Sequence, residues 1–161
     1  MSNALQTTGG DGGLYKAAYS NAQQEFVTMK VGNQLFGISV MAVQDVLRKQ
    51  RIAKVPLAPK VIAGSLNLRG RIVTAIDMRV RLGMADNDDP ESAMNVVVEY
   101  KNELYSLIVD RVGEVLSLPL DKFEKVPANL AEGWRTLSAG VFKLDKELLV
   151  ILDVENIIRI S

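Results

Sequence analysis

The residue types that most often carry enzyme chemistry are scarce in this chain. Its 161 residues include neither cysteine nor histidine, which excludes thiolate nucleophiles, disulfides, a phosphoacceptor histidine and zinc sites of the usual Cys/His kind. The carboxylates Asp77, Asp110 and Asp153 are isolated, and the sequence by itself pairs none of them for general acid–base work. Phosphate-loop and G-x-S-x-G motifs are missing as well. The sequence therefore favours a protein that binds partners, with no enzymatic activity, metal or cofactor.

One turn motif, Asn67-Leu68-Arg69-Gly70, offers recognition chemistry. An arginine on a rigid turn presents a planar fork of N–H donors that suits a carboxylate, either on the same surface or on a partner. A plain hairpin turn with a solvated arginine explains these four residues equally well when they are taken by themselves.

The chain contains two copies of one unit, and the comparison of the copies bears on this choice. Residues 32–47 recur as residues 101–116 with six identical pairs, and residues 63–78 match residues 139–154 at a longer offset. The second copy has about seven extra residues near 129–136. Its equivalent turn reads Lys143-Leu144-Asp145-Lys146, so the fold does not require Arg69, and the arginine becomes a candidate for function.

Short apolar segments at near-regular spacing, separated by turn signals, predict an all-β fold. We expect hairpins in residues 26–40 and 61–76, with counterparts in the second copy. The spacing of apolar residues in 40–47 predicts a helical turn or two. Asp77 and Asp153 each follow a strand, as helix N-caps do. A copy of roughly sixty residues is marginal for a core of its own, so two barrels should pack over a shared core.

The composition along the chain suggests its layout. Residues 1–23 should form a flexible N-terminal arm, because they are rich in small polar residues and show no periodicity. Residues 85–92 hold four acids but lack the glycine and terminal glutamate of a calcium loop. They predict an acidic linker between copies at about 24–84 and 93–160. With 19 acidic and 19 basic residues, the charge gives no support to nucleic-acid binding.

No basic segment followed by an apolar one marks a secretory signal, and no apolar run approaches the roughly twenty residues of a membrane helix. We therefore expect a cytoplasmic protein without direct membrane insertion.

From about Glu25 to Ile158, the chain resembles the CheW family of bacterial chemotaxis adaptors, whose domain also occurs in the kinase CheA. The resemblance rests on the hairpin in residues 26–38, Val43-Gln44-Asp45-Val46, the turn Asn67-Leu68-Arg69-Gly70, residues 72–82 with Asp77 and Arg79, and Val109-Asp110 with residues 115–118.

This resemblance implies two packed SH3-like five-stranded β-barrels with short helical turns and no catalytic activity. It also implies an adaptor that couples the cytoplasmic tips of methyl-accepting chemoreceptors to the regulatory domain of a CheA-type histidine kinase, within arrays at the membrane. Two alternatives remain open: a CheW-like adaptor of a non-flagellar pathway, and a small β-barrel module that binds another partner or ligand.

The resemblance also assigns interface positions residue by residue. Arg69 matches an arginine tied to kinase coupling, and Asp45 matches an acidic position beside it. The remaining kinase or receptor interface positions are Val43, Gly64, Asn67, Leu68, Gly70, Val96, Ser106, Val112 and Val115. Of these, Val96, Ser106, Val112 and Val115 match positions that are linked to receptor contact in the family.

Overall fold

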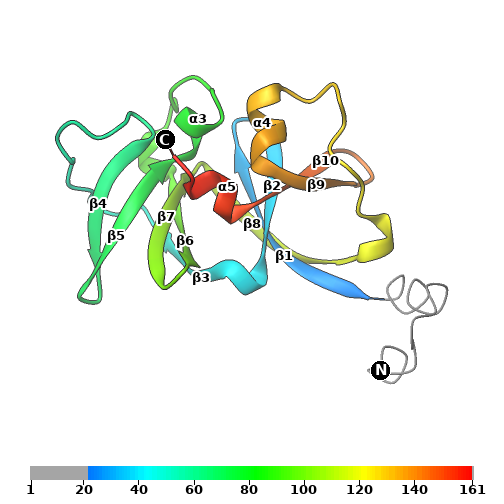
Figure 1. Cartoon of the computed structure of the whole chain (residues 1–161), viewed down its shortest axis with the longest axis horizontal. Helices are drawn as coiled ribbons and strands as arrows, with labels where there is room; N and C mark the ends of the chain where they lie inside the picture. Colours follow the sequence, from blue (N-terminus) through cyan, green and yellow to red (C-terminus); the bar gives the residue numbers. More distant parts are fainter. Residues whose placement is uncertain (1–21, 161) are drawn as a thin grey trace.

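The computed structural model describes residues 22–160, and most of the expected arm, residues 1–21, lies outside them. The strands form two five-stranded sheets (Figure 1). They are β1 (Gln23–Val31), β2 (Gln34–Ser39), β3 (Val43–Arg48), β4 (Ile62–Leu68), β5 (Arg71–Asp77), β6 (Met94–Tyr100), β7 (Glu103–Val109), β8 (Arg111–Pro119), β9 (Ser138–Lys143) and β10 (Leu148–Leu152).

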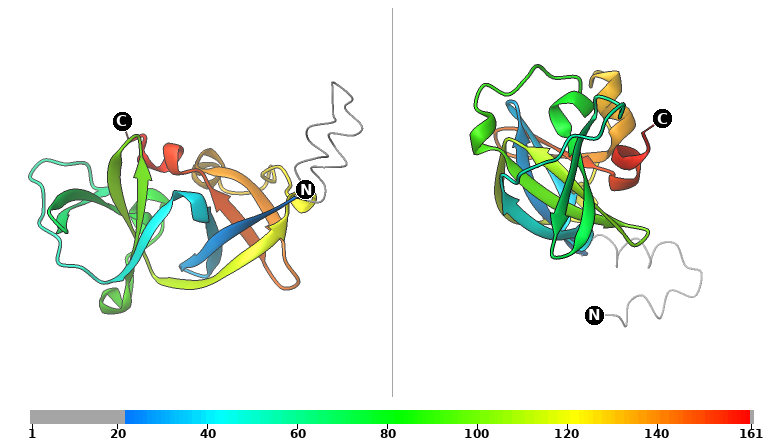
Figure 2. Two further views of the ribbon diagram at one scale, coloured as in Figure 1. Left: turned by 90° about the horizontal axis from the view of Figure 1, so that it is seen from below. Right: turned by 90° about the vertical axis from the view of Figure 1, so that its left-hand side faces the viewer.

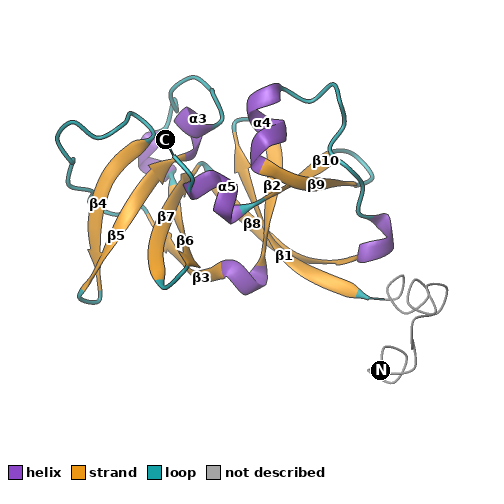
Figure 3. Ribbon diagram, viewed as in Figure 1, coloured by secondary structure: helices purple, strands orange, loops and turns teal. Residues whose placement is uncertain are grey.

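The helices are short; all of them lie between strands except α5, which follows the last strand (Figure 3). The α-helices are α3 (Met78–Arg81), α4 (Glu132–Leu137) and α5 (Val154–Ile158), and the 3-10 turns are η1 (Val40–Ala42), η2 (Pro90–Ser92) and η3 (Leu120–Lys122). None of these helices in residues 22–160 has the length and apolar character needed to cross a bilayer. The extra residues of the second copy include most of α4.

Each sheet is built from strands of both sequence copies. One has the order β8-β1-β2-β10-β9 and the other β3-β6-β7-β5-β4; we call them the β1 barrel and the β6 barrel. Replacing every strand by its counterpart in the other copy converts one order into the other. The copies at 24–84 and 93–160 therefore describe the sequence repeat, and neither copy alone makes a barrel.

The crossing occurs where a hairpin ends. After β2 the chain turns through η1 and enters the other sheet, where Val43 of β3 lies opposite Val98 of β6. In the second copy, β8 leaves the β6–β7 hairpin and pairs with β1. The helical turns expected in residues 40–47 are therefore confined to Val40–Ala42. Beyond Ala42 that prediction was wrong, because pairing with β6 draws the chain into a strand.

Each sheet closes into a barrel, which confirms the two barrels predicted from the sequence. A close backbone approach makes the closure in each case. In the β6 barrel, Ala53 and Ser65 exchange two N–H···O bonds of 2.8 Å. In the β1 barrel, Glu124 and Val141 do the same at 2.9 Å. Gly64 is needed for this approach, because an added Cβ would overlap the Ala53 carbonyl oxygen. The two barrels lie side by side along the long axis of the molecule (Figure 2).

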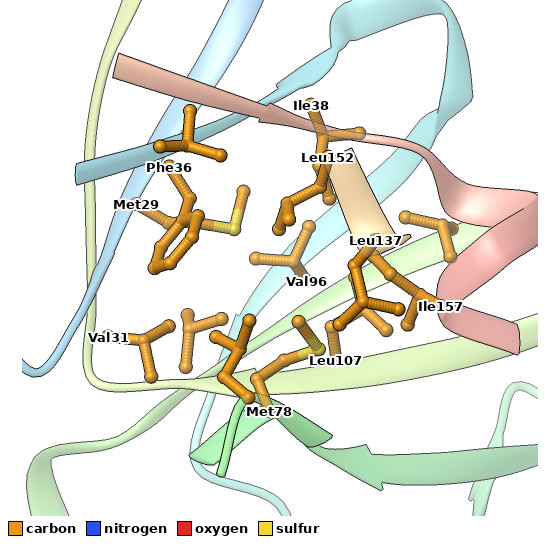
Figure 4. Packing of buried hydrophobic residues seen from close by; sticks show 14 of the residues in the cluster. Met29, Val31, Phe36, Ile38, Met78, Val96, Leu107, Leu137, Leu152 and Ile157 are labelled. Atoms are coloured by element: carbon orange, nitrogen blue, oxygen red, sulfur yellow. The ribbon is translucent and has the colours of Figure 1, made fainter. Parts of the chain in front are cut away.

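The largest hydrophobic cluster lies between the barrels and is shared by them. Met29 and Phe36 from the β1 barrel join Val96 and Leu107 from the β6 barrel, all with no exposed surface (Figure 4). Ile157 of α5 completes the cluster. Two smaller clusters, around Phe142 and Val73, occupy the separate sheets. Burying each large apolar side chain contributes roughly 1.5–3 kcal/mol, so the shared cluster is a principal source of stability.

The two predicted N-caps are confirmed. An Asp77 carboxylate oxygen accepts the backbone N–H groups of Arg79 and Val80, and Asp153 accepts that of Glu155. These bonds satisfy amide groups that have no partner within the short helices α3 and α5.

A half-buried ion pair joins the connections between the barrels. The guanidinium of Arg79 contacts both carboxylate oxygens of Asp110, at 3.0 Å and 2.6 Å, and donates to the carbonyls of Ala85 and Asp86. Asp110 also accepts the Gly32 N–H at 2.8 Å, from the β1–β2 turn. One arginine therefore fixes α3, the acidic linker and the exit of β7 at once.

The environment of Asp110 stabilises its charged form. Burial alone would raise the pKa of this carboxyl, but hydrogen bonds from Arg79 and the Gly32 N–H and the nearby positive charges hold it below the ordinary value of 3.8. Because folding lowers this pKa, the carboxylate stabilises the fold above pH 3.8. That contribution is lost as the pH falls below 3.8, through the folded-state pKa.

We predict that Asp110→Asn destabilises the protein by about 3 kcal/mol at pH 7, because it leaves Arg79 half-buried without its counter-ion. Asp45→Asn is the matched control: it removes the acid of an exposed pair worth roughly 0–1 kcal/mol. Urea unfolding at pH 7 and at pH 3 measures both variants. The difference between wild type and Asp110→Asn should shrink at pH 3, and an equal difference at both values would contradict the assigned role.

The strand exchange predicts that cleavage of the acidic linker leaves one assembled particle. A protease site in place of residues 88–91 would be cut, and the product compared with the uncut variant by size-exclusion chromatography and calorimetry. We expect one peak at the intact mass and one unfolding transition, since each barrel needs strands from both pieces. Two separable pieces that each melt cooperatively would refute this.

Candidate interaction site

The turn at residues 67–70 is a tight hairpin connection between β4 and β5. Arg69 and Gly70 both have positive φ, 51° and 86°, the combination that characterises a type I′ turn. The Asn67 carboxamide oxygen accepts the Gly70 N–H at 2.9 Å and braces the turn from within. The backbone beneath Arg69 is therefore fixed by local bonds, which positions its side chain at the tip.

Arg69 pairs with the acid at position 45. Its Nη2 lies 3.1 Å from an Asp45 carboxylate oxygen, although the two residues come from β3 and the β4–β5 turn. β3 and β4 are the two edge strands of the sheet. Closure of the barrel therefore brings the two side chains together. The Arg69 side chain is 76% exposed, so a pair of this kind adds little to stability and leaves most of the guanidinium facing outward.

The surface around this pair mixes apolar and charged groups. A depression of about 160 Å³ is lined by Leu68, Leu104 and Val97 together with Asp45 and Arg69. On the same hairpin, Ile72 lies opposite Asn67 and is 70% exposed. An apolar patch beside an oriented arginine has the composition of a protein-binding surface.

The equivalent corner of the β1 barrel lacks this chemistry. The repeat places Glu114 at the position of Asp45 and Asp145 at the position of Arg69, and both are exposed. Two carboxylates repel each other, so no equivalent pair can form. The site belongs to the β6 barrel alone.

The remaining interface positions from the sequence divide into surface and buried residues. Asn67 and Gly70 are exposed, Leu68 is half-buried in the depression, and Val43 packs at the margin of the shared core. The structure brings all four to β3 or the β4–β5 hairpin. Gly64 lies at the barrel closure described above and is buried.

The positions linked to receptor contact lie on β6, β7 and β8. Val112 and Val115 are on β8, and Val115 is 52% exposed. Val96 and Ser106 have no exposed surface, so neither side chain can contact a partner directly in this conformation. Ser106 lies in the β6 barrel, where its hydroxyl accepts a hydrogen bond of 2.7 Å from Asn95.

Sequence reasoning missed the exposed Ile72 and the Arg79–Asp110 pair. Ile72 had a detectable signal, because the alternation of buried Val73 and Ala75 on β5 places it on the opposite face. The ion pair had none, since its members are 31 residues apart and meet through the parallel pairing of β5 with β7. Within residues 22–160, no group of acidic side chains is arranged to hold a metal ion.

Comparisons with known proteins agree with this architecture. The sequence model of the CheW-like domain matches residues 25–161. The chain is 29% identical over 146 residues to the chemotaxis protein CheW of Klebsiella aerogenes, covering 89% of this chain and 86% of that protein. It is 28% identical over 140 residues to the protein PilI of Pseudomonas aeruginosa, covering 83% and 79%.

A solved structure shows the same fold. The scaffolding protein TtCheW from Thermoanaerobacter tengcongensis superposes with a TM-score of 0.79 at 25% identity, covering 87% of this chain and 95% of that one. The domain match begins at the third residue of β1 and spans both barrels and both sequence copies. The chain belongs to the CheW-like domain family.

Proposed function

We propose that this protein is a non-enzymatic adaptor that couples chemoreceptors to a CheA-type histidine kinase in a bacterial signalling array. The observation that carries the proposal is the match of the whole two-barrel domain to chemotaxis CheW proteins and to a scaffolding protein of that family. The protein would act in the cytoplasm and reach the membrane through its partners.

The Arg69 site supports a specific role in kinase coupling. The type I′ turn fixes the backbone, while the exposed guanidinium keeps N–H donors free for a partner carboxylate. The neighbouring Ile72 and Leu68 supply apolar contact. Recognition of this kind combines orientation by the arginine with affinity from buried apolar surface.

A second surface at β8 suits the receptor. Val115 is exposed on this strand, while Val112 packs against the shared core. The shared core also contacts β3 at Val43, so the two surfaces are connected by close-packed residues. A receptor state that prefers one arrangement of this core would shift the kinase through common contacts.

The similarity to PilI favours a second candidate, a CheW-like adaptor of a non-flagellar pathway, because its identity of 28% is close to the 29% for CheW.

Two pull-downs test the adaptor proposal: one offers the regulatory domain of a CheA-type kinase, and the other offers a receptor tip. Retention of both supports the adaptor proposal. Retention of neither would refute it and favour a barrel module with another ligand.

We predict that Arg69→Glu lowers kinase stimulation in a reconstituted receptor array by about tenfold or more. The change replaces a donor with a repelling carboxylate, and a charge-assisted hydrogen bond is worth about 1.5–3 kcal/mol. Thermal stability should change little, because the ion pair with Asp45 is exposed. Kinase phosphorylation and melting temperature provide the two readouts.

Two controls separate partner recognition from the internal ion pair. Asp145→Ala alters the equivalent turn of the β1 barrel and should leave kinase stimulation unchanged. The double variant Asp45→Arg/Arg69→Asp restores an ion pair with reversed charges, and we expect it to remain defective because the partner still meets the wrong charge. Full stimulation by the double variant would show that the pair itself is what matters.

We also predict that kinase binding has a negative heat-capacity change and a modest dependence on salt. A chain with no histidine, no cysteine and zero net charge gains its affinity chiefly from apolar burial with a polar rim. Isothermal titration at several temperatures and salt concentrations measures both quantities. Affinity that falls on addition of EDTA, or that drops steeply with salt, would contradict this.

A further inference from the structure

The two barrels contain equivalent cavities with different linings. In the β1 barrel the cavity is bordered by Phe26, Phe123 and Ile151, beside the N-cap Asp153. In the β6 barrel a cavity of about 430 Å³ is bordered by Asn95 and Ile108, beside the N-cap Asp77. The strand registers place Asn95 opposite Ile108 and Phe26 opposite Ser39, so Asn95 and Phe26 occupy the same position of the repeat.

This cavity is distinct from the Arg69 site. The register of β5 with β7 sets Asp77 beside Ile108, whereas Arg69 lies at the turn before β5. The cavity and the turn are therefore at opposite ends of the β6 barrel, near α3 and at the tip of the β4–β5 hairpin (Figure 1). An effect on one can be measured separately from an effect on the other.

Asn95 contributes an amide group to the lining of the cavity. The residue is 1% exposed, and its Nδ2 donates to Ser106 Oγ at 2.7 Å. Its Oδ1 accepts no hydrogen bond from any residue in 22–160, although every fully enclosed side-chain oxygen and nitrogen of that range has a partner. Oδ1 is therefore not fully enclosed, and Asn95 borders the cavity. The β1 barrel has the apolar side chain of Phe26 at the same position of its cavity.

The charged groups around the cavity differ in how many hydrogen-bond and ion-pair partners they already have. Each cation that borders it has an acidic partner: Lys49 lies 2.7 Å from Glu91 in an exposed pair, and Arg79 donates to Asp110 and two linker carbonyls. Two acids still have accepting capacity. Asp77 uses only Oδ1 for its cap, and the Asp86 carboxylate accepts no hydrogen bond from residues 22–160. The cavity thus offers hydrogen-bond acceptors and negative charge.

Apolar groups complete the lining. Ile52, Ile108 and Ala93 border the same space as the acceptors. Its volume falls in the range of small-molecule sites, which combine an apolar wall with a few oriented polar groups. The matching ligand has a short alkyl chain that ends in a group rich in N–H donors.

We propose that this cavity is a binding site for a small alkyl cation, whose ammonium or guanidinium group donates to Asn95 Oδ1, Asp77 and Asp86. The alkyl chain packs against Ile52 and Ile108. An anion is disfavoured because three carboxylates, Asp77, Asp86 and Asp110, border the cavity against two cations that already have acidic partners.

The test uses n-butylguanidinium as the probe, with n-butanol and butyrate as neutral and anionic controls of the same chain length. Two-dimensional amide NMR of the full chain follows the backbone signals near Asn95 and Asp77 during titration. We expect saturable shifts with the cation only. No saturable shift with the cation, or equal binding of butanol, would overturn the proposal.

Asp77→Asn tests the assignment without removing the helix cap, because asparagine retains the oxygen that accepts the Arg79 and Val80 N–H groups. We expect affinity for butylguanidinium to fall about tenfold or more, the loss of one charge-assisted hydrogen bond. Asp153→Asn makes the same change at the equivalent cap and should leave affinity unaltered. Equal affinities in both variants and wild type would refute the site. A melting temperature for each variant verifies folding.

A final arm identifies the source of the cation. A capped tripeptide, acetyl-Gly-Arg-Gly-amide, carries the same guanidinium on a protein backbone. Binding as tight as that of butylguanidinium would assign the site to an arginine side chain of a protein. Binding at least about tenfold weaker would assign it to a free small molecule, and both results support recognition of an alkyl cation.

Discussion

The apolar faces that the two sheets turn toward each other have no other cover, and this constraint organises the molecule. Met29 and Phe36 on one sheet and Val96 and Leu107 on the other are fully buried only because both barrels are present. The crossing strands strengthen the dependence, since each barrel contains strands from both halves of the chain. Asp45 itself stands on a strand that enters the β6 barrel from the β1–β2 hairpin, so its distance to Arg69 depends on the shared core.

The two barrels have nearly the same structure, so the positions at which their residues differ are easy to identify. Positions that maintain the fold are alike in both barrels: the N-caps Asp77 and Asp153, and the closure glycines Gly64 and Gly140, where an added Cβ would meet a backbone oxygen in each case. Positions that differ include the hairpin tip and the cavity lining, where Asn95 in one barrel corresponds to Phe26 in the other. Two homologous barrels in one chain therefore act as internal controls for each other, which a single barrel does not provide.

Local patterns were sufficient to predict the all-β class, the hairpins and both helix caps. These features depend on the alternation of apolar and polar residues, on turn residues, and on the carboxylate that follows a strand. The exchange of strands was not predictable in this way. The copies are so similar that a strand meets a comparable partner in either one, and side-chain pattern does not choose between them. Val43 and Val46 were predicted to lie in helical turns because of the spacing of nearby apolar residues. In the structure, pairing with β6 overrides this local preference and makes the segment a strand.

The sequence predicted which residues belong to the candidate site, but it did not predict how they are arranged in space. Arg69 and Gly70 were identified from the contrast between copies, but their distance from Asp45 follows from closure of a sheet whose edges are β3 and β4. Asn95 and Ser106 illustrate the opposite case. Their polarity in strands is visible in the sequence, yet the opening of Asn95 onto a cavity depends on how the linker and α3 surround it.

The exchanged topology has an evolutionary consequence. If the two copies were separate identical chains, the same strand orders would describe a two-fold symmetric dimer, in which any substitution would occur twice and every surface would be duplicated. The covalent connection through residues 85–92 places both halves in one gene product, so each position can mutate without its twin. One corner can then gain an arginine while the other keeps an acid. Asymmetric partners can thus be served by a fold whose framework remains symmetric.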